Sequence, residues 1–264
     1  MRLPQRIVCL TEETVETLYL LGEQDRIVGV SGYVVRPPEA RRDKPRVSAF
    51  TSANIDKILA LQPDLVLTFS DLQADIVAEL IRHGCAVHAF NHRDVSGILA
   101  MIETVGRLVG AADRAEKLAD SLARRMDLIR REVAGRAVRP RVFFEEWDEP
   151  LISAIGWVSE LIGIAGGEDV FAERAGGKSA TERIVSAEDV VARAPDIIIG
   201  SWCGKRFVAD RVRARPGFAN VPAVRTGALH EIKSSIILQP GPAALTDGLD
   251  ALHRIIGSGP SSPP

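Results

Sequence analysis

Two segments of this chain, 132 residues apart, share one pattern. Asp56–Leu67 reads as an acid, an apolar pair, Ala, a Pro-Asp step and an apolar run, and Glu188–Ile199 repeats this order. In each copy Pro fixes the backbone where a helix must end and a strand begin. An ordinary αβ turn can look like this, but a constant offset between the two halves of a chain favours duplication of a lobe. We therefore predict two related lobes.

The segment between the two copies predicts one long helix. In Ala111–Val133 apolar residues recur every three or four positions with charged residues largely between them, which is the period of a helix with one buried face. Arginines crowd its last turns, where a helix dipole favours cations. At about 1.5 Å per residue it is roughly 33 Å long. We expect it to join the lobes rigidly and to allow only small lobe movements on ligand binding.

Short apolar strands alternate with helices on both sides of this segment, which indicates an α/β fold with mainly parallel sheets. The expected strands are Arg6–Leu10, Arg26–Val30, Leu65–Phe69, Ala86–Phe90, Arg141–Phe144, Ile197–Ile199 and Leu229–Glu231. The expected helices are Glu13–Leu21, Asn54–Ala60, Ala74–Arg82, Val95–Val109, Trp157–Ile164, Ala187–Ala192, Arg206–Arg213 and Pro242–Ile256. The proline-rich stretch Ser31–Arg46 predicts a loop.

The predicted organisation is an N-terminal α/β lobe (residues 1–110), a connecting helix (111–135), a C-terminal α/β lobe (136–257) and a disordered tail (258–264). Ligands of parallel sheets bind at the carboxyl ends of the strands. We therefore expect a ligand cleft between the lobes.

Composition excludes several classes of protein. A net charge of −2 with mixed signs gives no basic stripe for nucleic acid. No apolar run approaches the ~20 residues that span a membrane. Three scattered cysteines do not make a disulfide framework or a zinc site. The apolar run Ile7–Leu10 is too short for a signal peptide, so we expect a cytoplasmic protein if Met1 is the native start and a periplasmic one if an export signal has been removed.

Candidate ligand contacts follow the predicted strands of the second half. Four acids surround Trp147 after the strand that begins at Arg141. A solvated turn would explain them; the functional interpretation is that Trp147 contacts a ligand and Glu146 accepts its hydrogen bonds. Trp202 follows the strand Ile197–Ile199 and is the strongest predicted contact, because core packing demands a Trp least at a strand end. Acids near these positions predict an acidic rim, namely Glu146, Asp148 and Glu182.

Other candidates carry weaker signals. Pro240 and Pro242 stiffen the segment Ser234–Pro242, which could face the cleft or form a plain structural corner. Lys233, just before it, and Gln239, within it, are candidate ligand contacts. His92 follows a strand and can reach the cleft, but the sequence gives no metal site. Cys203 invites an enzymatic interpretation, with a histidine as base; no triad spacing supports it, and we predict an inert thiol and no catalysis.

Short segments in a fixed order resemble the periplasmic substrate-binding proteins whose two lobes are joined by one rigid helix, the class that serves cobalamin and ferric-siderophore importers, and most of all its cobalamin-binding members. The matching segments are Arg6–Leu10 with Glu16, Gly29–Tyr33 before Pro37 and Pro38, Val47–Phe50, Asn54–Val66, Arg141–Phe143, Gly166–Phe171 and Val185–Val190.

The resemblance implies roles for particular residues. Asp56 and Glu188 fall on the two acidic positions, one per lobe, that pair with arginines of the membrane permease; each could otherwise simply open its helix. Tyr33 and Phe50 fall on aromatic positions that line the ligand cleft. Phe50 stands where Trp is usual in those proteins, and Glu182 occupies the approximate place of their second cleft Trp.

The resemblance also implies a function. We expect the substrate-binding component of an ABC-type importer, a monomer that captures cobalamin or a related corrinoid, docks to permease subunits and needs no cofactor. A ferric siderophore or haem is the alternative ligand on the same fold, and the acidic rim counts against an anionic siderophore. A cytoplasmic corrinoid-handling protein or an enzyme that reuses the fold is the alternative class.

Overall fold

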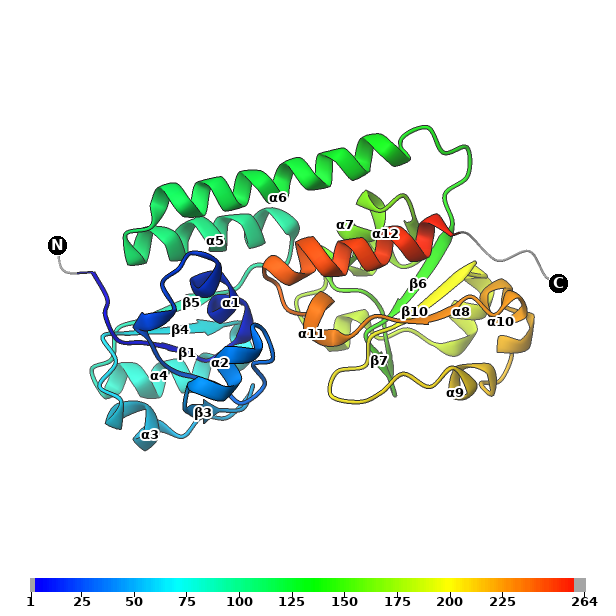
Figure 1. Cartoon of the computed structure of the whole chain (residues 1–264). Coiled ribbons are helices and arrows are strands. Elements are labelled where there is room, and N and C mark those ends of the chain that lie inside the picture. Colours follow the sequence, from blue (N-terminus) through cyan, green and yellow to red (C-terminus); the bar gives the residue numbers. More distant parts are fainter. Residues whose placement is uncertain (1–2, 259–264) are drawn as a thin grey trace. The chain divides into compact units, whose positions relative to one another are not determined.

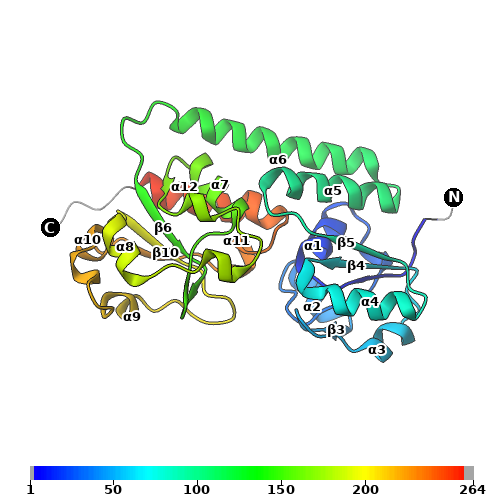
Figure 2. The ribbon, with the colours of Figure 1, turned by 180° about the vertical axis from the view of Figure 1, so that it is seen from behind.

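The computed structural model describes residues 3–258, and they form two compact units, each built around its own parallel sheet (Figures 1 and 2). Unit 1 runs through His92 and also takes in Ser96–Ser121, whereas unit 2 takes in Arg93–Val95 and the chain from Leu122 onward. Apart from Ser258, the tail predicted for 258–264 lies outside the described residues. The α/β fold class with two mainly parallel sheets is confirmed.

Unit 1 contains a five-stranded sheet in the order β3-β2-β1-β4-β5 with every neighbouring pair parallel. Its strands are β1 (Ile7–Cys9), β2 (Ile27–Ser31), β3 (Arg46–Ser48), β4 (Leu65–Phe69) and β5 (Val87–Phe90). Its helices are α1 (Glu12–Leu20), α2 (Pro38–Asp43), α3 (Ile55–Ala60), α4 (Ala74–Arg82) and α5 (Val95–Val109), whose first residue belongs to unit 2.

Strand alternation divides the core of unit 1 between two faces. Val8 and Val66 pack with Ile58 of α3 and Leu80 of α4. The intervening residues of these strands point to the opposite face. In both views α3 and α4 lie on one side of the sheet and α5 on the other (Figures 1 and 2). The inner strands β1, β2 and β4 are therefore buried on both faces, as their apolar runs predict, whereas the edge strands β3 and β5 are partly exposed.

Unit 2 contains a four-stranded parallel sheet in the order β11-β10-β6-β9 and a separate two-stranded antiparallel ribbon, β7-β8. Its strands are β6 (Arg141–Glu145), β7 (Trp147–Asp148), β8 (Leu151–Ile152), β9 (Glu168–Asp169), β10 (Ile197–Gly200) and β11 (Leu229–Glu231). Its helices are α7 (Gly156–Ile164), α8 (Ala187–Arg193), α9 (Ala209–Arg213), α10 (Pro222–Thr226), α11 (Ser234–Ile237) and α12 (Leu249–Gly257).

The two sheets share a plan. Strands β2-β1-β4-β5 of unit 1 correspond in order and direction to β9-β6-β10-β11 of unit 2. The N-cap side chains of the helices before β4 and β10, Asn54 and Ser186, each accept a hydrogen bond from the backbone N–H three residues on. Both helices are followed by a non-glycine residue with positive φ, 48° at Gln62 and 44° at Ala194. Each of these pairs is separated by the same 132 residues as the sequence repeat.

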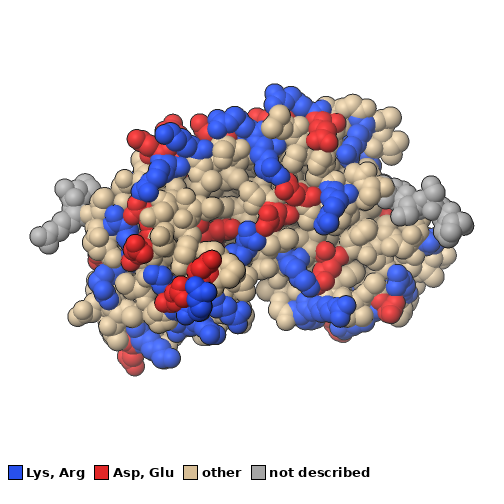
Figure 3. Space-filling view, in the orientation of Figure 1, with Lys and Arg blue, Asp and Glu red and all other residues tan. Residues whose placement is uncertain are grey.

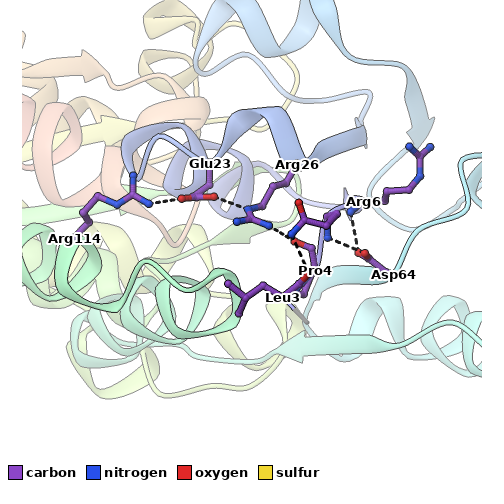
Figure 4. Close-up of polar contacts among 8 residues, drawn as sticks. Leu3, Pro4, Arg6, Glu23, Arg26, Asp64 and Arg114 are labelled. Carbon is purple, nitrogen blue, oxygen red and sulfur yellow. Dashed lines mark hydrogen bonds and ion pairs between the residues drawn. The ribbon is translucent and has the colours of Figure 1, made fainter. Parts of the chain in front are cut away.

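The aspartates of the two Pro-Asp steps have the same structural role. The Asp64 carboxylate accepts a hydrogen bond of 2.9 Å from the backbone N–H of Arg6, and that of Asp196 accepts one of 2.8 Å from Arg141 (Figure 4 shows Asp64). In return the backbone N–H of each aspartate donates to the carbonyl oxygen of the same arginine. These bonds fix the register in which the two central strands of each sheet begin.

Helix α6 (Ala112–Val133) matches the predicted long helix to within one residue and contributes to both units, 112–121 to unit 1 and 122–133 to unit 2. In unit 1 the Glu23 carboxylate accepts hydrogen bonds from Arg26 and from Arg114 of α6 (Figure 4). In unit 2, Arg125 pairs with Asp250 of α12. Each half of α6 therefore belongs structurally to the unit with which its side chains form these ion pairs.

Helices α5 and α6 lie side by side in both views, and a glycine permits their close approach (Figures 1 and 2). A Cβ at Gly106 would lie 2.2 Å from the Cβ of Ala115, whereas one at Gly163 of α7 would meet no atom within 4 Å. Packing therefore requires a glycine at position 106 but not at position 163.

We expect Gly106→Ala to destabilise unit 1 by about 1–3 kcal/mol, because the added methyl must push α5 away from α6. Gly163→Ala is the matched control and should stabilise the chain by about 0.5–1 kcal/mol, the ordinary gain for Gly to Ala in a helix. Urea unfolding followed by far-ultraviolet circular dichroism measures both. A neutral Gly106→Ala would contradict this packing.

Three sequence expectations about secondary structure were wrong. The loop predicted for Ser31–Arg46 contains helix α2, because Pro38 occupies a first-turn position, where a missing N–H costs nothing. The terminal helix predicted from Pro242 begins with a π-helical turn, Ala244–Gly248, packed against α11. The helix predicted from Arg206 starts only at Ala209, because the segment before it is extended and places Phe207 in the core.

Candidate functional site

The carboxyl edge of each sheet, where the carboxyl ends of its parallel strands meet, is the place where an α/β fold presents ligand-binding side chains. In unit 2 this edge carries Glu145, Glu146 and Asp148 directly after or within β6 and β7. On the face shown in Figure 3, acidic and basic side chains are interspersed. The cationic partners of the three acids decide what the edge can bind.

Glu145 is fully buried and ion-paired. Its two carboxylate oxygens accept hydrogen bonds of 2.6 and 2.7 Å from the Arg215 guanidinium, and its Oε1 accepts a third of 2.8 Å from the indole N–H of Trp202. A buried carboxylate is tolerated only when it is paired and hydrogen-bonded in this way. Glu145 is therefore a structural residue that holds Arg215 and Trp202 against the end of β6.

The other two acids are also neutralised. Arg183, 3% exposed, donates to Glu146 at 2.5 and 3.0 Å, and the carboxylate of Asp148 pairs with Lys205 and, at 3.2 Å, with Arg211. The predicted hydrogen bond from a ligand to Glu146 would have to compete with this bidentate pair. Two of the three acids of the predicted rim, Glu146 and Asp148, therefore have cations beside them. This pairing weakens the charge argument against anionic ligands.

Trp202 belongs to the core of unit 2. It is 2% exposed, and its ring packs edge-to-face on Phe207 with centroids 5.0 Å apart. The expectation that core packing does not demand this Trp was wrong, because Phe207 and the Glu145–Arg215 pair close over the strand end. No broad aromatic face of Trp202 is left for a flat ligand to stack on.

Trp147 has the properties that Trp202 lacks. It lines a pocket of about 360 Å³ with Glu146, Thr181 and Cys203, and the other walls are apolar, formed by Pro150, Ile152, Ala180 and Ile184. Its indole N–H donates to the carbonyl oxygen of Glu149 at 2.8 Å, and the Lys205 ammonium lies 3.8 Å from its ring centroid. These contacts fix the ring orientation. An apolar pocket with one oriented aromatic ring suits a large apolar ligand face.

Glu182 lies on the turn that forms one wall of this pocket but does not line it. Its side chain is exposed, and its carboxylate accepts hydrogen bonds from the backbone N–H of Lys178 and the hydroxyl of Ser179. Glu182 thus stabilises the turn Ala180–Arg183. The sequence did not single out Ile184, which is 37% exposed beside Trp147.

A second pocket, of about 290 Å³, lies beside the first and carries cations. Lys205, Arg206 and Lys233 line it together with Ser234 and the buried Trp202. Lys233 also pairs with Glu231 at 2.7 Å. Lys233, a predicted ligand contact, thus lines this pocket. Gln239, half-buried beyond α11, lines neither of the two pockets.

The carboxyl edge of unit 1 carries the remaining candidates. Tyr33 follows β2 and is 59% exposed, Phe50 follows β3 and is half-buried, and His92 follows β5 with its ring 5.1 Å from that of Phe69. Leu72, which the sequence did not single out, follows β4 and is 61% exposed. The signal in the sequence was the position of Leu72 shortly after the largely apolar, fully buried strand β4.

Two buried acids follow the central strand β1. Glu12 and Glu13 are 7% and 1% exposed, and burial raises the pKa of Glu12 to about 8 and that of Glu13 to about 7. The neighbouring charge of Glu16 adds to both increases, whereas a hydrogen bond from Thr11 opposes the increase at Glu13. This edge therefore holds carboxyl groups that take up protons near neutral pH.

Asp56 and Glu188 occupy equivalent exposed positions. Each is the second residue of its helix, α3 or α8. No group of three or more His, Cys, Asp and Glu residues within residues 3–258 is placed to hold a metal ion. Within the same range, no helix is long and apolar enough to cross a membrane.

The sequence profile of a family described as periplasmic binding protein matches residues 7–236. The chain belongs to this family. The members of this family are binding proteins rather than enzymes. The long helix pair α5–α6 places this chain in the class of the family whose two lobes are joined by a long helix. The predicted family is confirmed.

Several individual proteins are similar to this chain along most of its length. A cobalamin-binding protein of Halobacterium salinarum is 26% identical over 245 residues, which are 90% of this chain and 66% of that protein. A vitamin B12-binding protein of Vibrio cholerae is 26% identical over 255 residues, 95% of this chain and 87% of that one. A haem-binding periplasmic protein of Pseudomonas aeruginosa has the same fold, with a TM-score of 0.82 at 23% identity, covering 99% and 96% of the two chains.

Proposed function

We propose that this chain is the substrate-binding component of an ABC-type importer and that it captures cobalamin or a related corrinoid. The observation that carries the proposal is the apolar pocket beside Trp147 at the carboxyl edge of unit 2. Its walls can cover part of one face of a macrocycle, while Lys205, Arg206 and Lys233 stand beside it for polar substituents. The names of two relatives, each 26% identical, support a corrinoid.

Calorimetry with cyanocobalamin, cobinamide, haem and a ferric catecholate siderophore tests the ligand. We expect micromolar or tighter binding of the two corrinoids. Failure of all four compounds to bind would overturn the ligand class, and tight binding of haem or the siderophore alone would reassign it.

Haem or a ferric siderophore is the second candidate, and a specific observation favours it. The acids of the unit 2 edge are paired with cations, and the adjoining pocket adds Arg206 and Lys233. Propionates or catecholates are anions that such cations recognise. The same calorimetry separates the two candidates.

Replacing Trp147 by Ala is expected to weaken corrinoid binding about 30-fold, because a buried aromatic anchor contributes about 2 kcal/mol to binding. Trp147→Phe should retain most of the affinity. Calorimetry measures the ligand affinity of both variants under conditions in which each is fully folded. The matched control is Trp202→Phe, which removes an indole from the core and should lower stability more than affinity. Unchanged affinity in Trp147→Ala would exclude this pocket as the site.

We further propose that Asp56 and Glu188 dock the protein to arginines of the permease, and that the protein works outside the cytoplasmic membrane. The double variant Asp56→Lys/Glu188→Lys should lose ligand-dependent uptake in cells about 10-fold or more while keeping its ligand affinity, because opposed charges set the docking orientation. Asp75→Lys is the control, since Asp75 is also an exposed second residue of a helix, α4. Equal losses in both variants would exclude specific docking.

A further inference from the structure

Gln73 connects three strand ends at the carboxyl edge of unit 1. It is fully buried at the end of the 3₁₀ turn Asp71–Gln73. Its Nε2 donates to the carbonyl oxygens of Phe50 at 2.8 Å and Leu10 at 3.3 Å, and its Oε1 accepts from the backbone N–H of Phe69 at 3.1 Å. One amide thereby joins the segments that follow β3 and β1 to the last residue of β4.

Sheet pairing alone does not hold Phe50 in this way. Strand β3 pairs with β2 and ends at Ser48, so the ladder stops before Phe50. In the sheet order, β2 and β1 separate β3 from β4. The bond from Gln73 to the Phe50 carbonyl is therefore a link across two strands at the edge itself.

The turn that presents Gln73 is strained. Ser70 has φ of 71°, a conformation that is energetically unfavourable for a non-glycine residue. Its backbone N–H donates to the Phe90 carbonyl at 2.7 Å, and its hydroxyl accepts from the backbone N–H of Leu72. The turn sends Gln73 inward and leaves Leu72 exposed on the same edge.

A buried amide side chain stabilises a core less reliably than an apolar side chain of the same volume. The net contribution of a buried hydrogen bond to stability is small, whereas a buried polar group that loses its partner is strongly destabilising. An apolar side chain would fill the same volume without this risk. The amide contributes directional hydrogen bonds instead, and its three bonds fix one arrangement of the three strand ends.

We infer that Gln73 is a positioning residue for ligand binding, which fixes the main chain at Phe50 relative to β1 and β4 and so sets the Phe50 ring and Leu72 on the ligand-binding edge of unit 1. This inference rests on the proposed function for the ligand, but the positioning itself can be measured without any ligand.

The first experiment is hydrogen exchange of the ligand-free protein. Gln73→Met removes all three bonds at similar volume, and we expect amide exchange at residues 49–53 and at Phe69 to become at least 10-fold faster. Gln5→Met, at an exposed glutamine before the opposite end of β1, should leave these amides unchanged. Gln73→Glu, which keeps the shape and the acceptor but loses the donor, is a second variant if the Met variant does not fold. Unchanged exchange at 49–53 in the folded variant would overturn the inference.

The second experiment is a double-mutant cycle with cyanocobalamin. Gln73→Met should weaken binding about 10-fold in the natural background and less than 2-fold in a Phe50→Ala background, because its effect acts through Phe50. A merely structural role would lower stability and affinity equally in both backgrounds, and that result would overturn the inference. If the unmodified protein binds no cyanocobalamin, the ligand proposal fails while the exchange result still decides the positioning.

Discussion

Replacing Glu145 by Ala is expected to lower the free energy of unfolding of unit 2 by about 3–5 kcal/mol. The replacement leaves the half-buried Arg215 guanidinium without the two oxygens that it contacts, and it orphans the indole N–H of Trp202. All three tryptophans of the chain lie in unit 2. Urea unfolding followed by tryptophan fluorescence therefore reports on this unit.

Two variants separate this pair from a general charge effect. Glu149→Ala removes an exposed carboxylate only four residues away and should change stability by no more than about 0.5 kcal/mol. Glu145→Leu/Arg215→Met replaces both charges by apolar groups and should be more stable than Glu145→Ala. Equal stability losses in Glu145→Ala and Glu149→Ala would show that the buried pair contributes nothing.

Raising the pH from 5 to 8.5 is expected to destabilise unit 1, with a loss on the order of several kcal/mol when the raised pKa values of Glu12 and Glu13 are taken together. Folding raises these pKa values from about 4.5 to about 8 and about 7. The folded protein holds these protons where the unfolded chain has released them. The contribution is therefore complete below pH 4.5 and is lost as the pH rises to about 8.

The comparison that isolates this effect is Glu12→Gln/Glu13→Gln, followed by thermal unfolding across the same pH range. The amide variant should show a flatter dependence than the natural chain, because its two groups bind no protons. Glu39→Gln, an exposed first-turn acid of α2, should leave the dependence unchanged. Identical pH profiles for the natural chain and the double variant would contradict the burial of the two acids.

The ion pairs at the carboxyl edge of unit 2 bear on which ligand charges this edge can accept. Glu146, Asp148 and Glu182 were expected to count against an anionic ligand, but Arg183 pairs with Glu146 and Lys205 with Asp148. In the proposed site, net charge therefore does not separate a corrinoid from a haem or a siderophore. We expect the apolar area beside Trp147 and the polar substituents within reach of the adjoining cations to separate them.

Much of the fold could be predicted from the sequence because local patterns determine it. The period of Ala112–Val133 and the Pro-Asp steps at Asp64 and Asp196 are properties of neighbouring residues, and the structure reproduces them. Short helices such as α2 and α10 were missed. Each begins at a proline, and in Ser31–Arg46 the prolines were taken to indicate a loop.

Some features of the candidate site likewise follow from local sequence patterns, and others depend on tertiary contacts. The sequence by itself determined the repeated unit, the long helix and the placement of Trp147 and Trp202 at strand ends. Only the tertiary structure decided that Trp147 lines a pocket while Trp202 is buried, and that the adjacent acids are paired. The partners Arg183 and Arg215 lie 37 and 70 residues beyond the acids that they contact. Burial and charge pairing depend on distances in space, which a pattern of neighbours along the chain does not contain.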